Sequence, residues 1–595
     1  MIPTLFGRGS GLRRVIARLK RPVFGGWHML RVWRHKGAEG VAHWRRWRDE
    51  WGQIADPYQN WILWMEPRRT PPARQRRQVE SFSYRPRISI VTPVYNPPPD
   101  VLEATLRSVL AQTYENWELC LADGNSQTPG VKETLARFAQ ADPRIRVTYL
   151  EQNEGISGNS NRALQMGRGD FVLLLDHDDI LAPDALFEVV KLLKTHPDTN
   201  IVYFDEDKLS ADGSTRLEPW FKPHAWSPEM LLSVNYLMHS VLHRRLIKEV
   251  GGFDPATDGA QDWDLLLRCT EKTRKIRHIP RILYHWRKIP GSAAAEFTAK
   301  PWVFEAQARS VTAHLRRQGV PDPRLTFVDT VYPRPVWPTR GAMISLILPL
   351  GDRPAASMER LNALFAQTAY PHWEALLLGP RRPGVREEAR LRWLADADLA
   401  NRAGALNQAG RQAVGEMLLF LDPDLVPLAP DWLEEMARWA ERPEIGAVGA
   451  KLLGPDRRVR HAGLIAGLNG PAAPLFRGAQ PNECGMFGCV DWYRNYGAVS
   501  GDCLLVRRDL FEAVGGFSAS VPLREADADL CRRLIAQGYR IVYTPFAELI
   551  YSEAAAGSGV PIRIDTADPY FNPNLSAERA IPTFPTRGER RREAI

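Results

Sequence analysis

Short apolar runs alternate with stretches of helical periodicity along most of the chain. After residue 86, these runs predict strands at Ile88–Val91, ended by Thr92-Pro93, and at Glu118–Ala122, Ile145–Leu150 and Phe171–Leu175. Helical patterns lie between them, one carried by Leu102, Leu106, Val109 and Leu110 and another around Asn161–Met166. Strands that alternate with helices indicate a parallel, doubly wound sheet. Ligands of such sheets bind at the carboxyl ends of the strands, so the residues after each strand are the functional candidates.

The same order of elements returns near Ala342. The recurring strands are Ile344–Pro349, Trp373–Leu378 and Met417–Leu421, and Val250-Gly251-Gly252-Phe253 recurs as Val514-Gly515-Gly516-Phe517. Two diverged copies of one α/β domain account for 595 residues, which exceed what one core holds. We expect domains at 86–325 and 340–560. A basic helical arm with a linker (1–85) precedes them, and a C-terminal tail (561–595) follows.

Positive charge is concentrated in the arm. Residues 1–80 hold 17 Lys+Arg against 6 Asp+Glu, a local +11, which leaves −2 for residues 81–595 out of the total of +9. Seven of the nineteen tryptophans also lie there, and such a mixture suits an anionic membrane surface. The alternative is a helical lead-in whose tryptophans pack on the next domain. Nucleic acid is not expected as a partner, because no recognised binding motif accompanies the charge.

Apolar runs and cysteines indicate the compartment. No run approaches the ~18 residues that span a bilayer, and Arg8, Arg13 and Arg14 precede any long apolar stretch, so a signal peptide is not expected. The six cysteines show no CxxC spacing, and no histidine suggests zinc. We therefore expect reduced, mostly buried thiols in a cytoplasmic protein, which would be peripheral to the cytoplasmic face of the inner membrane if the arm binds lipid.

An acidic cluster follows one of the predicted strands. Asp176-His177-Asp178-Asp179 comes directly after an apolar strand, and carboxylates this close repel unless a cation binds. A divalent metal with oxygen ligands fits, and such metals commonly join carboxylates to phosphate oxygens. The alternative is a solvated turn that caps the helix beginning near Pro183.

Two further residues are candidates for chemistry. Asp262 lies at the start of the helix pattern that follows Gln261, where a carboxylate is either a cap for the helix dipole or a general base. His285 lies in a strand-like run, where a lone histidine is more often a packed core residue than a metal ligand.

These motifs together resemble those of the inverting GT-A glycosyltransferases of family 2. The resemblance covers residues 86–290 and rests on Ile88–Asn96, Gln112-Thr113-Tyr114, Asn153-Glu154-Gly155, Leu175–Asp179 and Gln261–Leu265. Within that group the chain is most similar to bacterial O-antigen and polysaccharide transferases. The segments shared with these are Asp205-Glu206-Asp207-Lys208, Phe221-Lys222-Pro223, Trp226-Ser227-Pro228 and Asn235-Tyr236 with His239.

The resemblance implies a role for each motif residue. Asp176 and Asp178 match the DxD pair that holds Mg or Mn against the diphosphate of a nucleotide-sugar donor, and His285 matches a histidine near the metal. Asp262 matches the catalytic base. The donor-binding residues that it implies are Pro93, Tyr95, Asp123, Asn153 and Asp176. The product would be a cell-surface glycan, built on a glycan or lipid-linked acceptor.

This chain departs from the family pattern at two positions. The family often has two adjacent acids where this chain has Asp123-Gly124, and its usual Glu-Asp pair is here Gln261-Asp262. The first departure changes the expected contact with the nucleotide base, and the second keeps the catalytic base Asp262 but removes its acidic neighbour.

The second copy retains only part of the set. Asp422 and Asp424 are its expected metal ligands and Asp527 its expected base, but no acid matches Asp123 and no strand histidine matches His285. A second transferase site and a non-catalytic acceptor-binding module both remain open.

Three other classes compete with this interpretation. Nucleotidyltransferases carry a Gly-rich loop with arginine after the first strand, which this chain lacks. Processive membrane synthases need membrane spans and a Gln-x-x-Arg-Trp element, which are also missing. A carbohydrate-binding scaffold would not need Asp176, Asp178 and Asp262 together.

Overall fold

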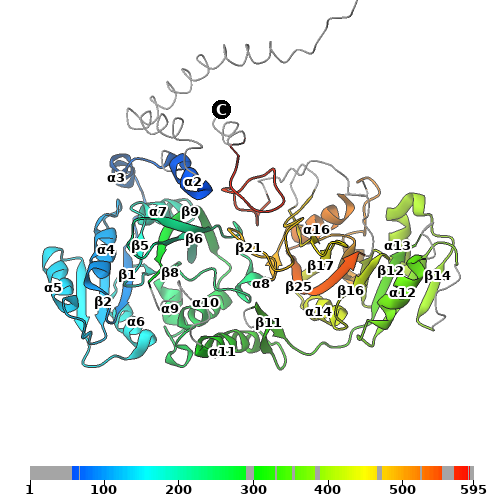
Figure 1. Cartoon of the computed structure of the whole chain (residues 1–595), viewed down its shortest axis with the longest axis horizontal. Coiled ribbons are helices and arrows are strands. Elements are labelled where there is room, and N and C mark those ends of the chain that lie inside the picture. The colour runs from blue at the N-terminus through cyan, green and yellow to red at the C-terminus, as the bar shows by residue number, and fades with distance from the viewer. Residues whose placement is uncertain are drawn as a thin grey trace, which may run out of the picture. The chain divides into compact units, whose positions relative to one another are not determined.

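The computed structural model describes most of the chain (Figure 1). The described residues are 56–65, 68–289, 301–328, 332–350, 356–381, 389–465, 472–522, 525–551, 568–586 and 589. The chain divides into two compact units, Met1–Ser83 and Tyr84–Ile595. The described helices of the first unit are α2 (Pro57–Met65) and α3 (Pro72–Glu80). Most of the basic arm, residues 1–55, lies outside the described residues, so its contact with a membrane stays a prediction.

A mixed sheet forms the first half of the second unit, and we call residues 84–328 the first module. Its strand order is β3-β2-β1-β4-β8-β6-β9-β5, and β7 pairs with β6. The bounds are β1 (Ile88–Val94), β2 (Trp117–Asp123), β3 (Ile145–Tyr149), β4 (Phe171–Leu174), β5 (Ile180–Leu181), β6 (Ile201–Leu209), β7 (Arg216–Trp220), β8 (Val241–His243) and β9 (Ile276–Arg287). Strands β1 to β4 are parallel, as the pattern predicts, whereas β8 runs antiparallel to β4 and β6.

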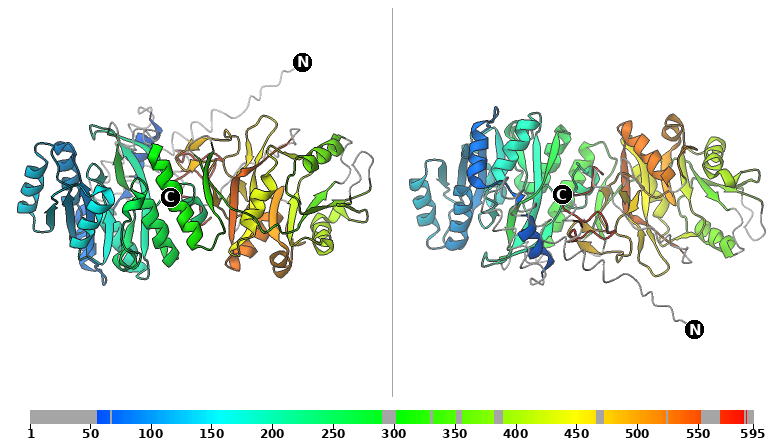
Figure 2. Two further views of the ribbon diagram at one scale, coloured as in Figure 1. Left: turned by 90° about the horizontal axis from the view of Figure 1, so that it is seen from below. Right: turned by 90° about the horizontal axis from the view of Figure 1, so that it is seen from above.

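Helices cover both sides of this sheet (Figure 2). Helix α4 packs on α5, α6 packs on β1 and β2, and α11 packs along α10. The bounds are α4 (Pro99–Leu110), α5 (Val131–Ala141), α6 (Gly155–Met166), α7 (Ala185–Thr195), α8 (Pro228–Leu231), α9 (Arg244–Glu249), α10 (Gln261–Lys272) and α11 (Pro301–Arg317). Proline at the first position and Asp100 in the first turn favour the start of α4, and Leu102 and Leu106 are buried.

One strand is longer than the pattern predicts. Strand β1 continues through Thr92-Pro93 to Val94, because the Val94 carbonyl accepts a hydrogen bond from Gly124 N at 2.8 Å and keeps β1 beside β2. Proline removes only a donor, so this pairing survives it. The carboxyl end of β1 therefore lies level with Asp123, which ends β2.

A second sheet repeats the first, and we call residues 342–551 the second module. Its order is β14-β13-β12-β15-β24-β17-β25-β16, with β18 on β17 and β23 on β25. The strands are β12 (Ile344–Pro349), β13 (Trp373–Leu378), β14 (Leu391–Leu394), β15 (Met417–Leu421), β16 (Leu425–Pro427), β17 (Ile445–Leu453), β18 (Val459–His461), β23 (Arg494–Asn495), β24 (Cys503–Arg507) and β25 (Arg540–Tyr551). The helices are α12 (Ala356–Ala366), α13 (Arg402–Gln412), α14 (Trp432–Ala440), α15 (Arg508–Ala513) and α16 (Ala526–Ala536).

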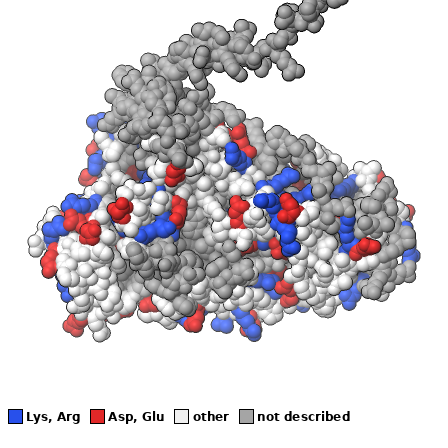
Figure 3. Space-filling view, in the orientation of Figure 1, with Lys and Arg blue, Asp and Glu red and all other residues white. Residues whose placement is uncertain are grey.

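Equivalent buried contacts recur in the two sheets. Ser89 donates to Glu118 at 2.7 Å in the first, and Ser345 donates to Glu374 at 2.6 Å in the second. These matching contacts support the predicted duplication; the exact domain limits stay a prediction. Acidic and basic side chains are interspersed over the face shown in Figure 3, in keeping with the small net charge of residues 81–595.

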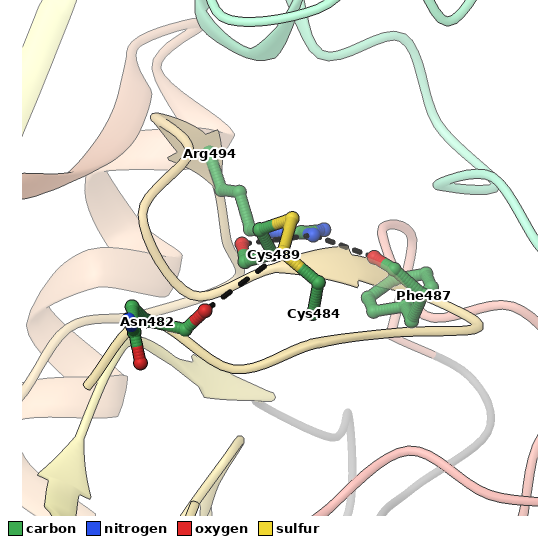
Figure 4. Close-up of a disulfide and its surroundings, with 5 residues drawn as sticks. All are labelled: Asn482, Cys484, Phe487, Cys489 and Arg494. Atoms are coloured by element: carbon green, nitrogen blue, oxygen red, sulfur yellow. Dashed lines mark hydrogen bonds between the residues drawn. A yellow bond between two sulfur atoms is a disulfide. The ribbon is translucent and has the colours of Figure 1, made fainter. Parts of the chain in front are cut away.

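Two cysteines correct the expectation of six reduced thiols. Cys484 and Cys489 form a disulfide that closes the hairpin of β21 (Cys484–Gly485) and β22 (Gly488–Cys489), shown in Figure 4. Only a short turn separates the two, and antiparallel pairing places them opposite each other. Arg494 donates to the Phe487 carbonyl inside this hairpin. The other four cysteines are free and buried, as expected.

The described helices were also searched for membrane spans. Within the described ranges, no helix combines the length and apolar character that crossing a bilayer requires.

Candidate active site

Four adjacent strands of the first module bring its predicted donor-binding residues to one edge. Tyr95 follows β1, Asp123 ends β2, Asn153 follows β3 and Asp176 follows β4. Because β3, β2, β1 and β4 are neighbours and parallel, their carboxyl ends meet there. Tyr95 is 45% exposed, so its ring is available to a ligand.

The Asp123 turn is held by its own hydrogen bonds. Asp123 is fully buried and accepts from Ser126 N at 3.2 Å. A Cβ at Gly124 would collide with the Asn159 amide, which in turn donates to Asn153 at 2.9 Å. A second acid at the glycine that departs from the family pattern would therefore require the Asn159 side chain to move from this arrangement.

The acidic loop after β4 is tied to β9. Tyr284 donates to Asp179 at 2.6 Å, and Arg287 donates from its backbone to the other oxygen of that carboxylate at 2.8 Å. The Arg287 side chain also donates to the Asp178 carbonyl at 2.9 Å. The Asp176 side chain is exposed, but desolvation by the surrounding groups and then the charge of Asp178 raise its pKa to about 6, whereas burial raises the pKa of Asp179 well above its usual value. Such repulsion is relieved when a cation binds.

A group with the chemistry of a metal site lies at this loop. Among the described residues, Asp176, Asp179 and His239 offer ligand atoms that all lie within 4.8 Å of one another. The Nδ1 atom of His239 is 2.9 Å from Glu206, which leaves Nε2 for a metal. Two carboxylates and one imidazole suit Mn or a similar divalent ion.

This group only partly matches the residues predicted from sequence. It includes Asp176 but replaces the expected Asp178 and His285 with Asp179 and His239. Those roles of Asp178 and His285 stay predictions. His239 belongs to one of the segments shared with O-antigen transferases, and this was the only sequence feature that pointed to it as a site residue. Its part in the group depends on contacts that no local pattern reveals.

Strand β6 supplies a carboxylate to each of three histidines. Asp205 lies 2.9 Å from His278 Nε2, Glu206 lies 2.9 Å from His239 Nδ1, and Asp207 lies 2.5 Å from His285 Nδ1. A carboxylate behind a histidine fixes the ring and its tautomer and strengthens it as a metal ligand. Each acid of the motif Asp205-Glu206-Asp207 therefore orients one histidine, and Glu206 orients His239 of the metal group.

The predicted base lies at the start of α10. Asn235 donates to Asp262 at 2.8 Å, and burial raises the pKa of Asp262. The charge of Asp262 acts on Asp176, which places the base in the surroundings of the acidic loop. The amide oxygen of Asn235, Oδ1, is buried, and it has no hydrogen-bond partner among the described residues.

The second module holds a different arrangement. Asp424 forms an ion pair with Arg360 at 2.9 Å, and Asp527 accepts from Gly501 N at 2.9 Å. Burial raises the pKa of Asp527 to about 6. Tyr551 donates to Asp502 at 2.6 Å.

Both modules match the same protein family model. The model described as "Glycosyl transferase family 2" matches residues 89–244 and 398–515, one segment in each module. These two segments resemble glycosyl transferase family 2, and we call them the family 2 segments. The first family 2 segment contains Asp176, Asp179 and His239, and the second contains Asp422 and Asp424.

Curated relatives extend over both family 2 segments. The chain is 38% identical over 551 residues to uncharacterized protein y4gI of Sinorhizobium fredii, covering 87% of this chain and 60% of that protein. It is 36% identical over 549 residues to O-antigen biosynthesis protein RfbC of Myxococcus xanthus, covering 88% of this chain and 43% of that protein. The chain thus spans about half the length of these relatives.

A solved structure with a bound donor is also similar to this chain. S. aureus TarS 1-349 in complex with UDP-GlcNAc is 18% identical with a TM-score of 0.33, covering 38% of this chain and 66% of that one.

Proposed function

We propose that the first module is a metal-dependent, inverting glycosyltransferase of polysaccharide or O-antigen biosynthesis. The observation that carries this proposal is the group of Asp176, Asp179 and His239 at the carboxyl edge of the sheet, with Asp262 nearby. The family 2 match and the RfbC relative support the reaction class and the pathway. The substrate is a nucleotide-sugar, and the acceptor is a glycan or lipid-linked glycan.

The proposed site has a donor side and an acceptor side. Tyr95, Asp123 and Asn153 hold the nucleotide, and Asp176, Asp179 and His239 would hold Mg or Mn. A divalent ion there stabilises negative charge on the leaving diphosphate.

Asp262 serves the acceptor side. The acceptor hydroxyl attacks the anomeric carbon as the bond from that carbon to the diphosphate breaks, and the hydroxyl proton passes to the Asp262 carboxylate. Attack opposite the leaving group inverts the configuration of the sugar.

The base and the donor side can be tested separately. General-base help is typically worth 10²–10⁴-fold, so Asp262→Asn should lower kcat by about that factor and leave donor affinity nearly unchanged. Asp176→Asn should instead weaken donor binding, and excess EDTA should abolish transfer. The measurements are nucleotide release from a panel of nucleotide-sugars and calorimetric donor binding.

Glu218→Gln is the matched control, because that carboxylate is 57% exposed in an ion pair with Lys288 and has no part in the proposed site. Full turnover in EDTA, or an Asp262→Asn enzyme as fast as wild type, contradicts the proposal.

The second module is proposed to be either a second transferase site or an acceptor-binding module. Its Asp422 and Asp527 favour the first, because they occupy the positions of Asp176 and Asp262. Asp527→Asn distinguishes them. Loss of a second, different linkage supports catalysis, whereas an unchanged kcat with a higher acceptor KM supports binding alone.

A further inference from the structure

The strand pairing aligns the two acidic loops residue by residue. Ile88 pairs with Phe171 in the first sheet, and Ile344 pairs with Met417 in the second, so Phe171 and Met417 occupy the same position. Counting onward from these two residues, Asp176 matches Asp422, Asp178 matches Asp424 and Asp179 matches Leu425. One member of the first module's metal group is therefore a leucine in the second.

The histidine of the group is also replaced. Phe171 pairs with His243 of β8, and Met417 pairs with Arg507 of β24. His243 and Arg507 each precede a short helix, α9 and α15, which confirms the match. Counting back from them, His239 matches Cys503. The Cys503 thiol is buried against Met436 Sδ at 3.7 Å, inside the core.

The residues that support the group have changed with it. Glu206 pairs with Tyr284 in the first sheet, and Leu452 pairs with Leu549 at the same place in the second. The four residues that match two hydrogen-bonded pairs of the first module are apolar: Leu425 and Leu549 match Asp179 and Tyr284, and Leu452 and Cys503 match Glu206 and His239. All four replacements in the second module are at most 1% exposed.

A side-chain cation lies beside one of the two remaining carboxylates, Asp424. Arg360 of α12 contacts Asp424 at 2.9 Å, and the two side chains are 14% and 28% exposed. In the first module, the matching Asp178 lies near Asp176, whose pKa its charge raises. A partly buried guanidinium offsets such repulsion without a metal.

We propose that the second module has lost the metal centre, and that the four apolar replacements and the Arg360–Asp424 ion pair stand in its place. The chain then binds one divalent ion, in the first module, and any donor or acceptor chemistry of the second module proceeds without a metal. This inference rests on the proposed metal site of the first module.

Counting bound manganese in the full-length protein tests this inference. Titration of Mn²⁺ followed by electron paramagnetic resonance and by calorimetry should give one tight site per chain. Asp176→Asn should weaken that site at least tenfold, whereas Asp422→Asn should leave both the number of sites and the affinity unchanged. Circular dichroism establishes that each variant is folded.

The outcomes separate this inference from the proposed function. Two ions per chain, with one lost in Asp422→Asn, overturn the inference and leave the first module's metal intact. If the protein binds no ion, both the metal dependence in the proposed function and the inference of one site per chain are wrong. Arg360→Met provides a second variant: the count should stay at one, and a gain of a second site contradicts the loss of the centre.

Discussion

At the scale of single residues, the amide of Asn235 links the base to the space around it. One end of the amide donates to Asp262, and the other end, Oδ1, is buried without a protein partner. An unsatisfied buried acceptor costs free energy, so it is retained where a ligand can supply the donor. A sugar hydroxyl has the required chemistry, and we propose that Asn235 belongs to the acceptor side of the proposed site.

The hydrogen bond from Asn235 gives a pH prediction. It favours the charged form of Asp262, whereas burial raises the pKa of that carboxyl. Asn235→Ala removes the favourable contact, so the pKa of Asp262 rises further. Because the base works deprotonated, the acid limb of the kcat/KM profile should move to higher pH. Profiles measured for both proteins check this, and an unchanged limb would show that Asn235 does not act through Asp262.

The sequence identified some site residues and missed others for a physical reason. Asp176 and Asp262 were found because each follows a strand or opens a helix with a recognisable pattern. Asp179 and His239 needed the fold: the Asp179 carboxylate is positioned by Tyr284 and Arg287, which lie more than a hundred residues away. The resemblance to the DxD pair favoured Asp178 over its neighbour Asp179.

At the scale of elements, β6 carries three consecutive acids, a composition that disfavours strands. The structure pairs β6 with β9 and places a histidine beside each acid. Tertiary contacts therefore stabilise a strand that the local sequence disfavours. The strands β1, β2 and β4 were predictable from sequence because parallel strands buried on both faces are continuous apolar runs.

The buried ion pair next to β6 gives a stability prediction. Lys222 is 1% exposed and contacts Glu206 at 2.8 Å. Lys222→Ala leaves a buried carboxylate without this partner and should cost about 3–5 kcal/mol of unfolding free energy. Lys288→Ala, which breaks the exposed pair with Glu218, should cost only ~0–1 kcal/mol. Urea unfolding measures both, and equal losses would contradict the burial argument.

The same pair predicts the direction of acid destabilisation. Burial alone would raise the pKa of Glu206, but the charges of Lys222 and His239 lower it to about 2. A depressed pKa contributes stability that is complete above the unfolded value of ~4.3 and is lost as pH falls toward 2. Wild type should therefore lose more stability than Lys222→Ala between pH 5 and pH 2.

At the scale of the whole molecule, the second compact unit includes both modules and part of the C-terminal tail. Arg540 of the second module contacts Glu229 at 2.7 Å, and Asn495 accepts from Ser227 at 2.8 Å. From the tail, Asn572 donates to Asp205 at 3.0 Å. Composition predicted only a tail at 561–595, since the partners of Asn572 are set by distant parts of the chain.

Truncation tests the role of the tail. Ending the chain after residue 567 removes the donors Asn572 and Asn574 from the buried Asp205, and it also removes the buried ring of Phe571 that packs near Phe487. Each unsatisfied buried group costs about 1–3 kcal/mol, so the unfolding temperature should fall by several degrees. Removing only residues 590–595 is the control and should change little. Tryptophan fluorescence on heating measures both, and equal melting curves would show that the tail is dispensable.

The segment from Phe221 to His239 has a consequence for engineering. Phe221 donates to the Met486 carbonyl of the disulfide-closed hairpin, and Ser233 accepts from Tyr493 N. Asn235 and His239 of the proposed site lie on this same segment, as does Lys222, the ion-pair partner of Glu206. A chimera that exchanges the second module for one from another enzyme would therefore remove contacts that position the segment carrying first-module site residues. Exchanging modules at a boundary between the two sheets would then change the first module's activity as well as the second's.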